Sequence, residues 1–456
     1  MGGRLISGGA TYPIRGVSID SRSLSQNELF FAIRGERFDG HAFVTTALQQ
    51  GACGVVVSDM EIASETQVRQ PVAIIITVDD TTRALQRLAQ YLRRASGAQV
   101  VAITGSVGKT TTKELTADLL STHYRVFKTP GNLNNHIGLP LSLIELRHKP
   151  EIAVVEIGMR HSGEISTLVT VAEPEVRVWT NVAAVHAEYF DSIGAIADAK
   201  AEIMSGATVD SLLIVNAGDE RIMERVHTFA GCVTTFGIEK VADVMAIDVN
   251  DHGLEGTTAR VKTPVGAARL RSPLLGRGNL ANVLAAMAVA LHYQVPLSAI
   301  VQRISAFSPL DQRGEIVRLH DGVTLIDDSY NSNPTALLCT FEAIRQESRS
   351  GRLIGILGEM LELGSRSKQL HEECGRAAAA VGFDVLITVG DEPAEAIGKA
   401  AVAAGMPPGS VTHMVTSQEV AEHVTKLVCP GDLVLVKGSR GVRTDLVVRR
   451  LRAELT

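Results

Sequence analysis

The sequence predicts an α/β protein with mostly parallel sheets, and three observations lead to that fold class. Short apolar runs alternate with segments of helical periodicity along the whole chain. At 456 residues the chain is too long for one core, so we expect several domains. One apolar run ends in a glycine turn followed by Lys109-Thr110, as in a phosphate loop between a strand and a helix. We therefore expect a small N-terminal α/β domain at residues 1–98, a central domain with a mostly parallel sheet and a small antiparallel sheet at 99–309, and a C-terminal α/β domain at 310–456.

Each domain repeats the rhythm of strands and helices. In the N-terminal domain the pattern predicts strands at residues 29–33, 54–57 and 73–78 and helices at 41–50 and 81–95. In the central domain it predicts a strand just before the glycine turn, strands at 152–157, 176–180 and 212–215, and helices at 113–120 and 279–293. Residues 243–271 alternate polar and apolar side chains between Gly and Pro, which predicts the antiparallel strands. After a linker at Ser308-Pro309, strands are expected at 324–326, 353–357, 385–389 and 433–436.

Composition and charge narrow the class of protein. The formal net charge of −6 argues against a general nucleic-acid binder, because such proteins carry basic surfaces. No apolar run reaches the roughly 18 residues that span a bilayer, and the N-terminus shows no secretory signal. The five cysteines are scattered and odd in number, which fits neither a zinc site nor a disulfide framework. We expect a cytoplasmic monomer that binds small molecules, with most of its cysteines acting as small buried apolar residues.

The segment from residue 104 to residue 112 carries the strongest chemical signal. The backbone N–H groups of such a turn and the positive end of the next helix form an anion site; Lys109 can reach outer phosphates, and Thr110 can bind magnesium. The spacing is shorter than usual, because Gly105 comes only three residues before Gly108. The segment therefore predicts nucleotide binding and weakens a general nucleotide-hydrolase interpretation, with a plain glycine turn as the alternative.

Polar residues stand at the ends of several predicted strands, among them Glu156, Asn181, Asp327 and Lys437. Ligands of open parallel sheets bind at this carboxyl edge. We expect Glu156 to be half-buried beside the phosphate loop, where a magnesium ligand is needed; a solvated strand end is the alternative. Because two domains present such an edge, we expect the site in a cleft between the central and C-terminal domains.

Four residues of the central domain have competing structural interpretations. A lone histidine such as His186 is more often structural, and Lys200 on its own would be a helix-surface lysine. Asn279 and Asn282 stand three residues apart and share a helix face. Their amides suit the edge of a purine, and a plain helix cap is the alternative.

The C-terminal domain contributes a second group of candidates. Arg313 follows the linker, and together with Asp327 it could hold the phosphate and ribose of a nucleotide. Turn chemistry of Asx and proline residues is the alternative for the segment after Asp327. Lys437 begins a glycine turn with two cations that could bind a carboxylate or a phosphate, or could be a plain solvated turn.

Together these segments resemble the Mur ligase family, the ATP-dependent enzymes that build the peptide of the bacterial cell wall. Residues 104–112 resemble the family's shortened phosphate loop, and the segments around Glu156, His186, Lys200, Asn279, Arg313 and Asp327 match in order and rough spacing. Residues 20–22 and 29–41 resemble the domain that holds the UDP-sugar. The resemblance covers nearly the whole chain and implies a P-loop ATPase-like central domain and a Rossmann-like C-terminal domain.

Three segments, at residues 131–140, 327–334 and 436–440, favour one activity within the family. They resemble the member that joins D-alanyl-D-alanine to UDP-N-acetylmuramoyl-tripeptide through an acyl phosphate, with ATP and Mg²⁺, in peptidoglycan precursor synthesis. The member that adds the third amino acid carries an Asp-Asn-Pro-Arg motif, whereas Asn333-Pro334 is followed here by Thr335.

The resemblance also implies roles for single residues. Lys109 stabilises the transferring phosphoryl group, Thr110 and Glu156 hold magnesium, and His186 and Lys200 belong to a second metal site in which the family's lysine is often carbamylated. The residues implied for ATP are Gly105, Ser106, Val107, Gly108, Lys109, Thr110, Thr111, Asn279, Asn282, Arg313 and Asp327. The residues implied for the other substrates are Ser21 and Arg22 for the UDP-sugar, Asn134 and Asn135 for the reacting end of the tripeptide, and Asn331 and Lys437 in the domain that receives the dipeptide.

Other functions stay open at the level of sequence. A second ligase of the same family, a tripeptide synthase, is one of them. Folylpolyglutamate synthase shares the ATP core but begins near the phosphate loop, so the N-terminal domain counts against it. A nucleotide-regulated switch would hydrolyse ATP or GTP without any amine acceptor.

Overall fold

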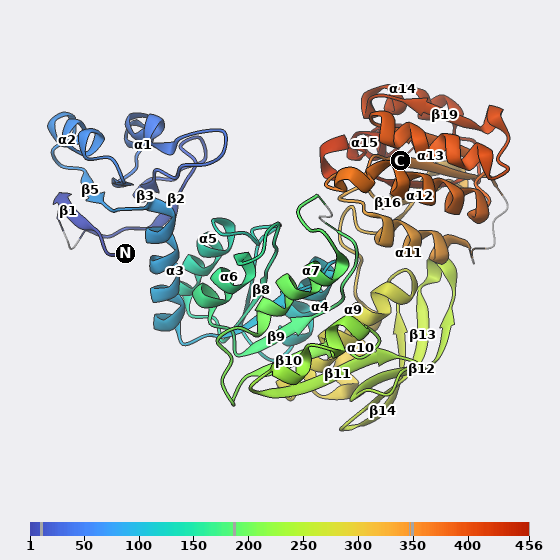
Figure 1. Ribbon diagram of the computed structural model, residues 1–456, viewed down its shortest axis with the longest axis horizontal. Coiled ribbons are helices and arrows are strands. Elements are labelled where there is room, and N and C mark those ends of the chain that lie inside the picture. Colours follow the sequence, from blue (N-terminus) through green and yellow to red (C-terminus); the bar gives the residue numbers. More distant parts are fainter. Residues whose placement is uncertain (10–11, 186–187, 346, 348–350, 456) are drawn as a thin grey trace. The chain divides into compact units, whose positions relative to one another are not determined.

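The computed structural model describes residues 1–9, 12–185, 188–345, 347 and 351–455. The chain forms two compact units. Unit 1 comprises Met1–Ile103, Tyr124–Arg177 and Glu202–Ser211, and unit 2 comprises Thr104–His123, Val178–Ala201 and Leu212–Thr456. Within the described residues the strands form three sheets of five, nine and six strands, and helices follow most strands along the chain (Figure 1). The predicted α/β class with mostly parallel strands is confirmed.

The first sheet has the strand order β1-β5-β4-β3-β2, in which only β1 runs antiparallel to its neighbour. Its core consists of apolar side chains such as Phe30, Val55 and Ile75, all nearly inaccessible to water. The strands are β1 Arg4–Ser7, β2 Gly16–Ser18, β3 Glu28–Phe31, β4 Gly54–Val57 and β5 Ile74–Thr77. The helices are η1 Gly40–Phe43, α1 Val44–Gln49, α2 Met60–Arg69 and α3 Thr81–Ser96.

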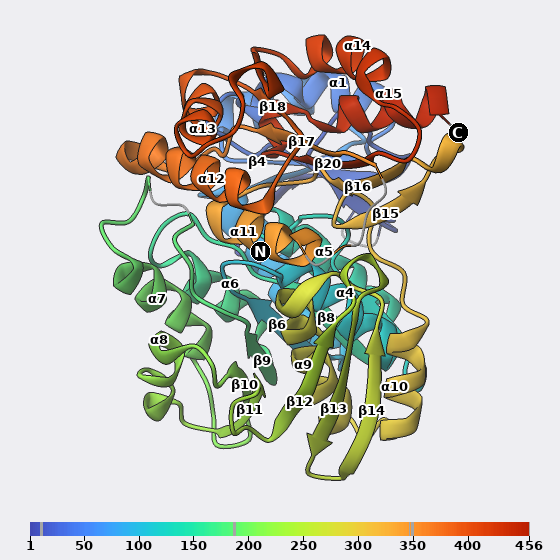
Figure 2. The ribbon, with the colours of Figure 1, turned by 90° about the vertical axis from the view of Figure 1, so that its right-hand side faces the viewer.

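The second sheet has the order β14-β13-β12-β11-β10-β9-β6-β8-β7. The predicted antiparallel strands at 243–271 are confirmed, and they continue the parallel sheet because β12 pairs parallel with β11 (Figure 2). The strands are β6 Gln99–Thr104, β7 Val126–Lys128, β8 Ile152–Glu156, β9 Val176–Trp179, β10 Leu212–Asn216, β11 Cys232–Ile238, β12 Val244–Asp251, β13 Thr257–Thr263 and β14 Gly266–Ser272.

Helices connect these strands, and two of them begin earlier than the sequence pattern indicates. α4 begins at Lys109 rather than Lys113 because Gly108 takes a left-handed conformation that ends the turn, and α9 begins at Gly276 rather than Asn279. The α-helices are α4 Lys109–Leu120, α5 Gly138–Ile144, α6 Glu164–Ala172, α7 Ile193–Ala201, α8 Glu220–Met223, α9 Gly276–His292 and α10 Leu297–Ser305. The 3-10 segments are η2 Glu145–His148, η3 Glu202–Met204, η4 Val226–Thr228 and η5 Gly253–Glu255.

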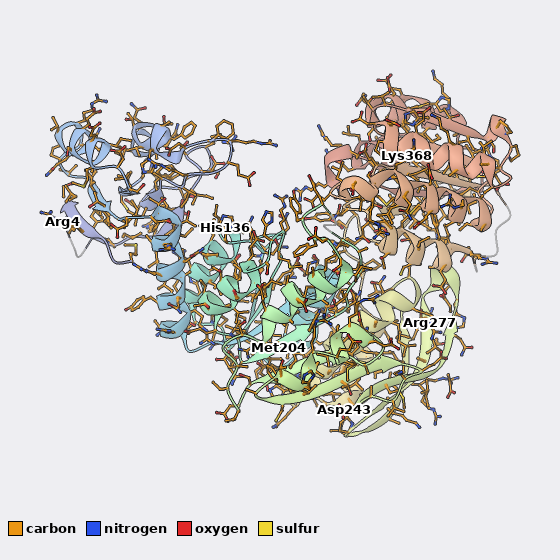
Figure 3. All side chains as sticks on the ribbon, viewed as in Figure 1. Arg4, His136, Met204, Asp243, Arg277 and Lys368 are labelled. Atoms are coloured by element: carbon orange, nitrogen blue, oxygen red, sulfur yellow. The ribbon has the colours of Figure 1, made fainter. Side chains whose placement is uncertain are left out.

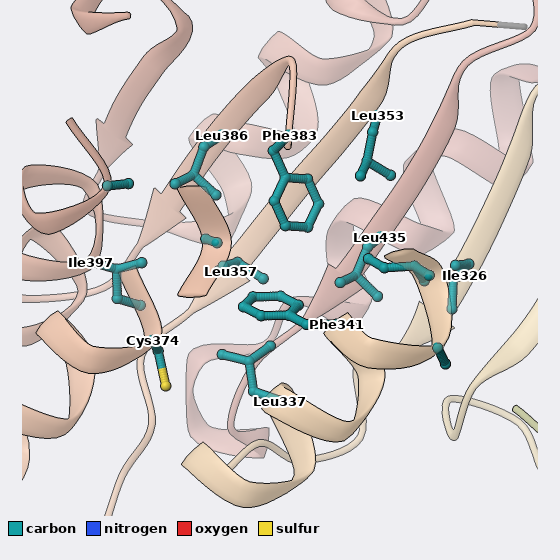
Figure 4. Packing of buried hydrophobic residues seen from close by; sticks show 14 of the residues in the cluster. Ile326, Leu337, Phe341, Leu353, Leu357, Cys374, Phe383, Leu386, Ile397 and Leu435 are labelled. Atoms are coloured by element: carbon teal, nitrogen blue, oxygen red, sulfur yellow. The ribbon is translucent and has the colours of Figure 1, made fainter. Parts of the chain in front are cut away.

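The third sheet has the order β15-β16-β20-β17-β18-β19 and is parallel except for the β15–β16 pair. Side chains of its strands alternate between two cores. Leu435 packs with α11, α12 and α13, and Val434 packs with α14 and α15. In the first of these cores the rings of Phe341 and Phe383 meet edge to face with centroids 5.5 Å apart (Figure 4). Helices therefore cover both faces of this sheet.

Four strands of this third sheet, β16, β17, β18 and β20, lie close to the predicted positions, whereas β15 and β19 were not predicted. The strands are β15 Glu315–Arg318, β16 Thr324–Asp328, β17 Leu353–Gly358, β18 Val385–Val389, β19 Val411–Met414 and β20 Leu433–Lys437. The α-helices are α11 Pro334–Arg345, α12 Ser367–Val381, α13 Glu392–Ala403, α14 Ser417–Leu427 and α15 Asp445–Leu455. The 3-10 segments are η6 His320–Gly322, η7 Gly364–Arg366, η8 Pro408–Ser410 and η9 Arg440–Val442.

Two expectations from composition can be compared with the structure. The prediction that most cysteines are buried is wrong: Cys374 is buried and Cys53 half-buried, whereas Cys232, Cys339 and Cys429 are exposed. All five have free thiols. Across the described part of the chain, no helix has the length and apolar character needed to cross a bilayer.

Candidate functional site

The predicted phosphate loop connects β6 to α4 and depends on two glycines with positive φ. Gly105 has a φ of 153° and Gly108 a φ of 83°, and residues other than glycine rarely adopt such backbone conformations. A Cβ on Gly105 would overlap Thr180 Oγ1, and a Cβ on Gly108 would overlap Asn282 Oδ1. Both glycines are therefore required by the backbone conformation and by the close packing of neighbouring side chains.

The residues that follow β9 hold this loop in place. Asn181 accepts a hydrogen bond from Val107 N at 2.9 Å and donates one from Nδ2 to Val107 O at 2.9 Å. Thr180 Oγ1 donates to the same carbonyl at 3.0 Å. Ser106 Oγ accepts from Ala183 N at 2.9 Å. The loop is thus fixed by the segment that follows the next strand of the sheet, which gives it a rigid shape before any ligand binds.

Two lysines meet at one carbonyl of this loop. Lys109 Nζ donates to Gly105 O at 2.8 Å and to Ser106 O at 3.2 Å, and Lys200 Nζ donates to Gly105 O at 3.0 Å. Lys200 is buried, so the interpretation of it as a helix-surface lysine is wrong. Burial, and to a smaller degree the charge of Lys109, hold the pKa of Lys200 well below its ordinary value of 10.5.

The pKa of Lys200 predicts how stability depends on pH. The folded-state pKa lies below the unfolded-state value, so the unfolded chain binds more protons between the two values, and the destabilisation that burial of Lys200 causes shrinks as the pH rises toward about 10.5. The variant Lys200→Met lacks this destabilisation. We expect it to be more stable than wild type at pH 7, with the difference in unfolding free energy shrinking at pH 9.

Urea denaturation at both pH values measures this difference. Gly105 O keeps the hydrogen bond from Lys109 in the variant, so no carbonyl loses its only partner. Lys262→Met at an exposed position of β13 controls for the loss of one lysine. A difference between Lys200→Met and wild type that does not change with pH would contradict the burial argument.

Asn279 and Asn282 share a face of α9, as predicted, but neither caps the helix, because α9 begins at Gly276. Asn279 Nδ2 donates to Leu275 O at 2.9 Å, and Asn282 Nδ2 donates to Asn279 Oδ1 at 3.1 Å. Asn282 Oδ1 accepts from Thr112 Oγ1 at 3.3 Å. In the same helical turn Arg277 (Figure 3) forms an ion pair with Glu239 at 2.6 Å.

Glu156 ends β8 and is buried, whereas the sequence led us to expect a half-buried side chain. One carboxylate oxygen accepts a hydrogen bond from Asn134 Nδ2 at 2.7 Å. The neighbouring Asn135 uses its side chain locally, since Oδ1 accepts from Ile137 N at 3.1 Å and from Gly138 N at 2.8 Å. The segment around Asn134 is thus anchored directly beside a buried carboxylate.

Of the two residues of the predicted second metal site, Lys200 donates to the loop carbonyl of Gly105, and His186 lies outside the described residues. Among the residues that are described, no three His, Cys, Asp or Glu side chains cluster closely enough to hold a metal ion.

The candidates after the linker gather at the carboxyl edge of the third sheet. Lys437 Nζ donates to Asp328 Oδ2 at 2.6 Å and to Asn331 O at 3.2 Å. Asp327 is buried, its carboxylate accepts from Ser329 Oγ at 2.6 Å, and burial raises its pKa. The turn chemistry considered for this segment is therefore present at Asp327. Lys437 is buried as well, so it does not lie in a plain solvated turn.

Arg313 contacts the same segment through an aromatic ring. Its guanidinium lies 4.0 Å from the ring centroid of Tyr330, and Arg440 donates to the Tyr330 hydroxyl at 3.0 Å. Tyr330 thus connects Arg313, which follows the linker, to the glycine turn after β20. Sequence reasoning assigned no role to Tyr330, and its place inside the segment 327–334 is the signal that could have found it.

In the N-terminal sheet, Ser21 and Arg22 follow β2. Ser21 is buried, and Arg22 is exposed and pairs with Asp20 at 2.6 Å. That pair lowers the pKa of Asp20 to about 2. Both residues therefore lie at the carboxyl end of a parallel strand, where ligands of such sheets bind.

Sequence reasoning also assigned no role to two residues that anchor the chain after Lys200. The Glu202 carboxylate accepts from Gly163 N at 2.6 Å and Ser166 N at 3.1 Å at the start of α6. Buried Arg177 donates from Nε to Ile203 O at 3.0 Å. Glu202 lies in the segment around Lys200 that drew attention, whereas nothing in the sequence pattern marks Arg177.

Comparisons with known proteins find similarity over nearly the whole chain. Three family models match the chain: "Mur ligase family, catalytic domain" over residues 13–93, "Mur ligase middle domain" over 103–290, and "Mur ligase, glutamate ligase domain" over 312–440. The UDP-N-acetylmuramoyl-tripeptide–D-alanyl-D-alanine ligase of Bacillus subtilis is 34% identical over 443 residues, which cover 96% of this chain and 93% of that protein.

Solved structures of similar proteins match over nearly the same length. MurF from Acinetobacter baumannii superposes with a TM-score of 0.86 at 29% identity, covering 97% of this chain and 94% of that one. MurF ligase from Thermotoga maritima in complex with ADP superposes with a TM-score of 0.82 at 27% identity, covering 96% of this chain and 97% of that one.

Proposed function

Because the chain belongs to the Mur ligase family, we propose that it joins D-alanyl-D-alanine to UDP-N-acetylmuramoyl-tripeptide at the expense of ATP, in peptidoglycan precursor synthesis. Members of the family are ATP-dependent ligases that form carbon–nitrogen bonds. The observation that carries the proposal is the rigid loop of Gly105 to Lys109, with a second, buried lysine at the same carbonyl, in a chain that matches such ligases over nearly its whole length.

The reaction we propose has two steps. The terminal carboxylate of the tripeptide attacks the γ-phosphorus of ATP, so that a carboxyl–phosphate bond forms and ADP leaves. The amine of D-alanyl-D-alanine then attacks the acyl carbon, the amide bond forms, and phosphate leaves with loss of one proton from nitrogen. The protein's part is to hold the reactants and offset charge, which Lys109 does at the transferring phosphoryl group.

The loop fits ATP because its shape is set before binding and its lysine is already directed at the loop carbonyls. The rest of the loop, Gly105, Ser106, Val107, Gly108, Thr110 and Thr111, surrounds the phosphates in this proposal. Asn279 and Asn282 face the adenine, and Arg313 and Asp327 contact the nucleotide from the C-terminal domain.

Magnesium fits the oxygen donors that Thr110 and Glu156 offer, because hard cations prefer hydroxyl and carboxylate ligands. The carboxylate of Glu156 is buried, and one of its oxygens accepts a hydrogen bond from Asn134 Nδ2. A bound Mg²⁺ would offset the repulsion between the tripeptide carboxylate and the triphosphate.

We propose a second cation site at His186 and Lys200. As an ammonium Lys200 has no lone pair for a cation, whereas the carbamate that the amine forms with CO₂ would offer carboxylate-like oxygens. Burial supports that reaction, since it favours the uncharged amine that attacks CO₂. Intact-protein mass spectrometry would show the added CO₂.

We also assign residues to the other substrates. Ser21 and Arg22 contact the UDP-sugar, Asn134 and Asn135 the reacting end of the tripeptide, and Asn331 and Lys437 the incoming dipeptide. The three family models fall within residues 1–98, 99–309 and 310–456, which supports these ranges as UDP-sugar, ATP and dipeptide domains. The proposal places a monomeric enzyme in the cytoplasm, where ATP is available and the free thiols of this chain stay reduced.

Phosphate release by the purified protein tests the function. We expect release from ATP only when UDP-N-acetylmuramoyl-tripeptide and D-alanyl-D-alanine are both present, and loss of release on chelation of Mg²⁺. A panel of amine acceptors separates the other ligases: release with an amino acid and UDP-N-acetylmuramoyl-dipeptide indicates a tripeptide synthase, and release with folate and glutamate a folylpolyglutamate synthase. Release without any acceptor indicates a nucleotide switch and contradicts the proposal.

A further inference from the structure

The geometry points to Asn282 as a positioning residue that holds the Gly108 turn of the phosphate loop, through a hydrogen-bonded chain that includes Thr112. This inference rests on the proposed ATP chemistry of that loop. It assigns to Asn282 an action through the protein, in addition to the adenine contact proposed above, and it assigns to Thr112 a role that the sequence did not indicate.

A series of hydrogen bonds connects the start of α9 with the start of α4. Asn279 Nδ2 donates to Leu275 O, the backbone carbonyl just before α9, at 2.9 Å. Asn282 Nδ2 donates to Asn279 Oδ1 at 3.1 Å, and Thr112 Oγ1 donates to Asn282 Oδ1 at 3.3 Å. Thr112 lies in the first turn of α4, directly after the loop, and its own N–H donates to Gly108 O at 2.8 Å.

Close packing allows this series of hydrogen bonds to support the phosphate loop. Asn282 is only 6% exposed and Thr112 is fully buried. The amide of Asn282 lies so close to Gly108 that a Cβ there would overlap Oδ1. The Asn282 amide, which is hydrogen-bonded through both its oxygen and its nitrogen, therefore packs directly against the left-handed turn at Gly108. Loss of either hydrogen bond lets the amide rotate and removes this support from Gly108. Because Lys109 follows Gly108 directly, its position changes as well.

A base contact and a positioning role predict different kinetics. A residue that reads adenine changes the preference of the enzyme for ATP over GTP. A residue that holds the loop lowers turnover with both nucleotides and leaves that preference unchanged, because the phosphates are common to both. Thr112 separates the two roles most cleanly, since its hydroxyl donates to Asn282 rather than to a residue of the loop.

The experiment compares five single variants of the full chain, Thr112→Val, Thr112→Ser, Asn282→Ala, Asn279→Ala and Thr116→Val. The last is the matched control. Thr116 lies one turn further along α4, is fully buried, and its hydroxyl has no hydrogen-bond partner among the described residues. kcat and KM are measured for ATP and GTP with both other substrates, ADP binding is measured by calorimetry, and thermal unfolding checks the fold.

We expect Thr112→Val and Asn282→Ala to lower kcat about tenfold with either nucleotide, the change that about 1.4 kcal/mol in the barrier produces. Their ATP:GTP ratio of kcat/KM stays at the wild-type value, Thr112→Ser restores kcat, and ADP binds more weakly to both damaged variants. Thr116→Val behaves as wild type. The inference is overturned if Thr112→Val has the same kcat and ADP affinity as Thr116→Val. It is also overturned if Asn282→Ala changes only the preference for ATP over GTP.

The two proposals fail in different ways. Absence of turnover in the wild-type enzyme contradicts the proposed ligase activity. The positioning role is then still decided by calorimetry, where Thr112→Val must bind ADP more weakly than Thr116→Val does.

Discussion

Replacing Lys109 by alanine is expected to lower ATP turnover by about 10²- to 10³-fold, the usual effect of removing one donor to developing charge. The ammonium group lies within 2.8 Å of Gly105 O and 3.2 Å of Ser106 O, so it is already held at the loop. The variant removes the positive charge at the transferring phosphoryl group. Phosphate release in the complete reaction mixture measures the loss.

Stability changes little in this variant, because Gly105 O retains the hydrogen bond from Lys200. Lys109→Arg keeps the charge but not the compact ammonium geometry, and we expect it to remain strongly impaired. Lys262→Ala removes one exposed lysine from β13 and serves as the control for net charge. Wild-type turnover in Lys109→Ala would remove this residue from the chemistry.

Gly108→Ala is expected to lower the free energy of unfolding by about 2–4 kcal/mol and to abolish ATP turnover. Two costs combine in this variant. The backbone has a φ of 83°, which an L-residue adopts only with strain, and the new methyl group would overlap Asn282 Oδ1. Asn282 cannot move away cheaply, since both ends of its amide are hydrogen-bonded. Urea denaturation gives the stability, and phosphate release gives the activity.

Gly97→Ala provides the matched control for backbone strain alone. Gly97 ends α3 with a φ of 71°, and a Cβ there would meet nothing within 4 Å. We expect a cost of about 1 kcal/mol and unchanged turnover. The difference between the two variants then measures the steric contact with Asn282. Equal losses in both variants would show that this contact contributes nothing.

Much of the fold could be predicted from local pattern. The strands at β4 and β18 begin and end at the predicted residues, because continuous apolar runs bounded by turn residues define a buried parallel strand. β11 was not predicted, since Thr234 and Thr235 interrupt its apolar pattern and only pairing with β10 and β12 makes it a strand. α4 and α9 begin earlier than predicted because glycine turns and tertiary contacts, rather than side-chain periodicity, decide their first turns.

The residues of the candidate site also fall into those that local sequence predicts and those that only tertiary contacts reveal. Gly105, Gly108 and Lys109 could be recognised in the sequence because a phosphate loop is a contiguous segment whose residue types are dictated by local backbone geometry. The burial of Lys200 and Lys437 could not be recognised in the sequence, since a lysine judged without its neighbours in space is most often solvated. Thr112 and Tyr330 lie in segments that the sequence marked, but their contacts with Asn282 and Arg313 could not be predicted because these partners are distant in the chain. Arg177 gave no usable signal, because it acts through Ile203, which is also distant in the chain.

For this protein, the order of residues along the chain was sufficient to establish the α/β class, the nucleotide loop and the family, because each of these is encoded in short segments with their own backbone requirements. Long-range packing alone established that two lysines share Gly105 O, that Asn282 supports Gly108, and that Glu156 and Asp327 are buried. Burial and hydrogen-bond partners arise where distant segments meet, and these set the charge state of Lys200 and the rigidity of the loop.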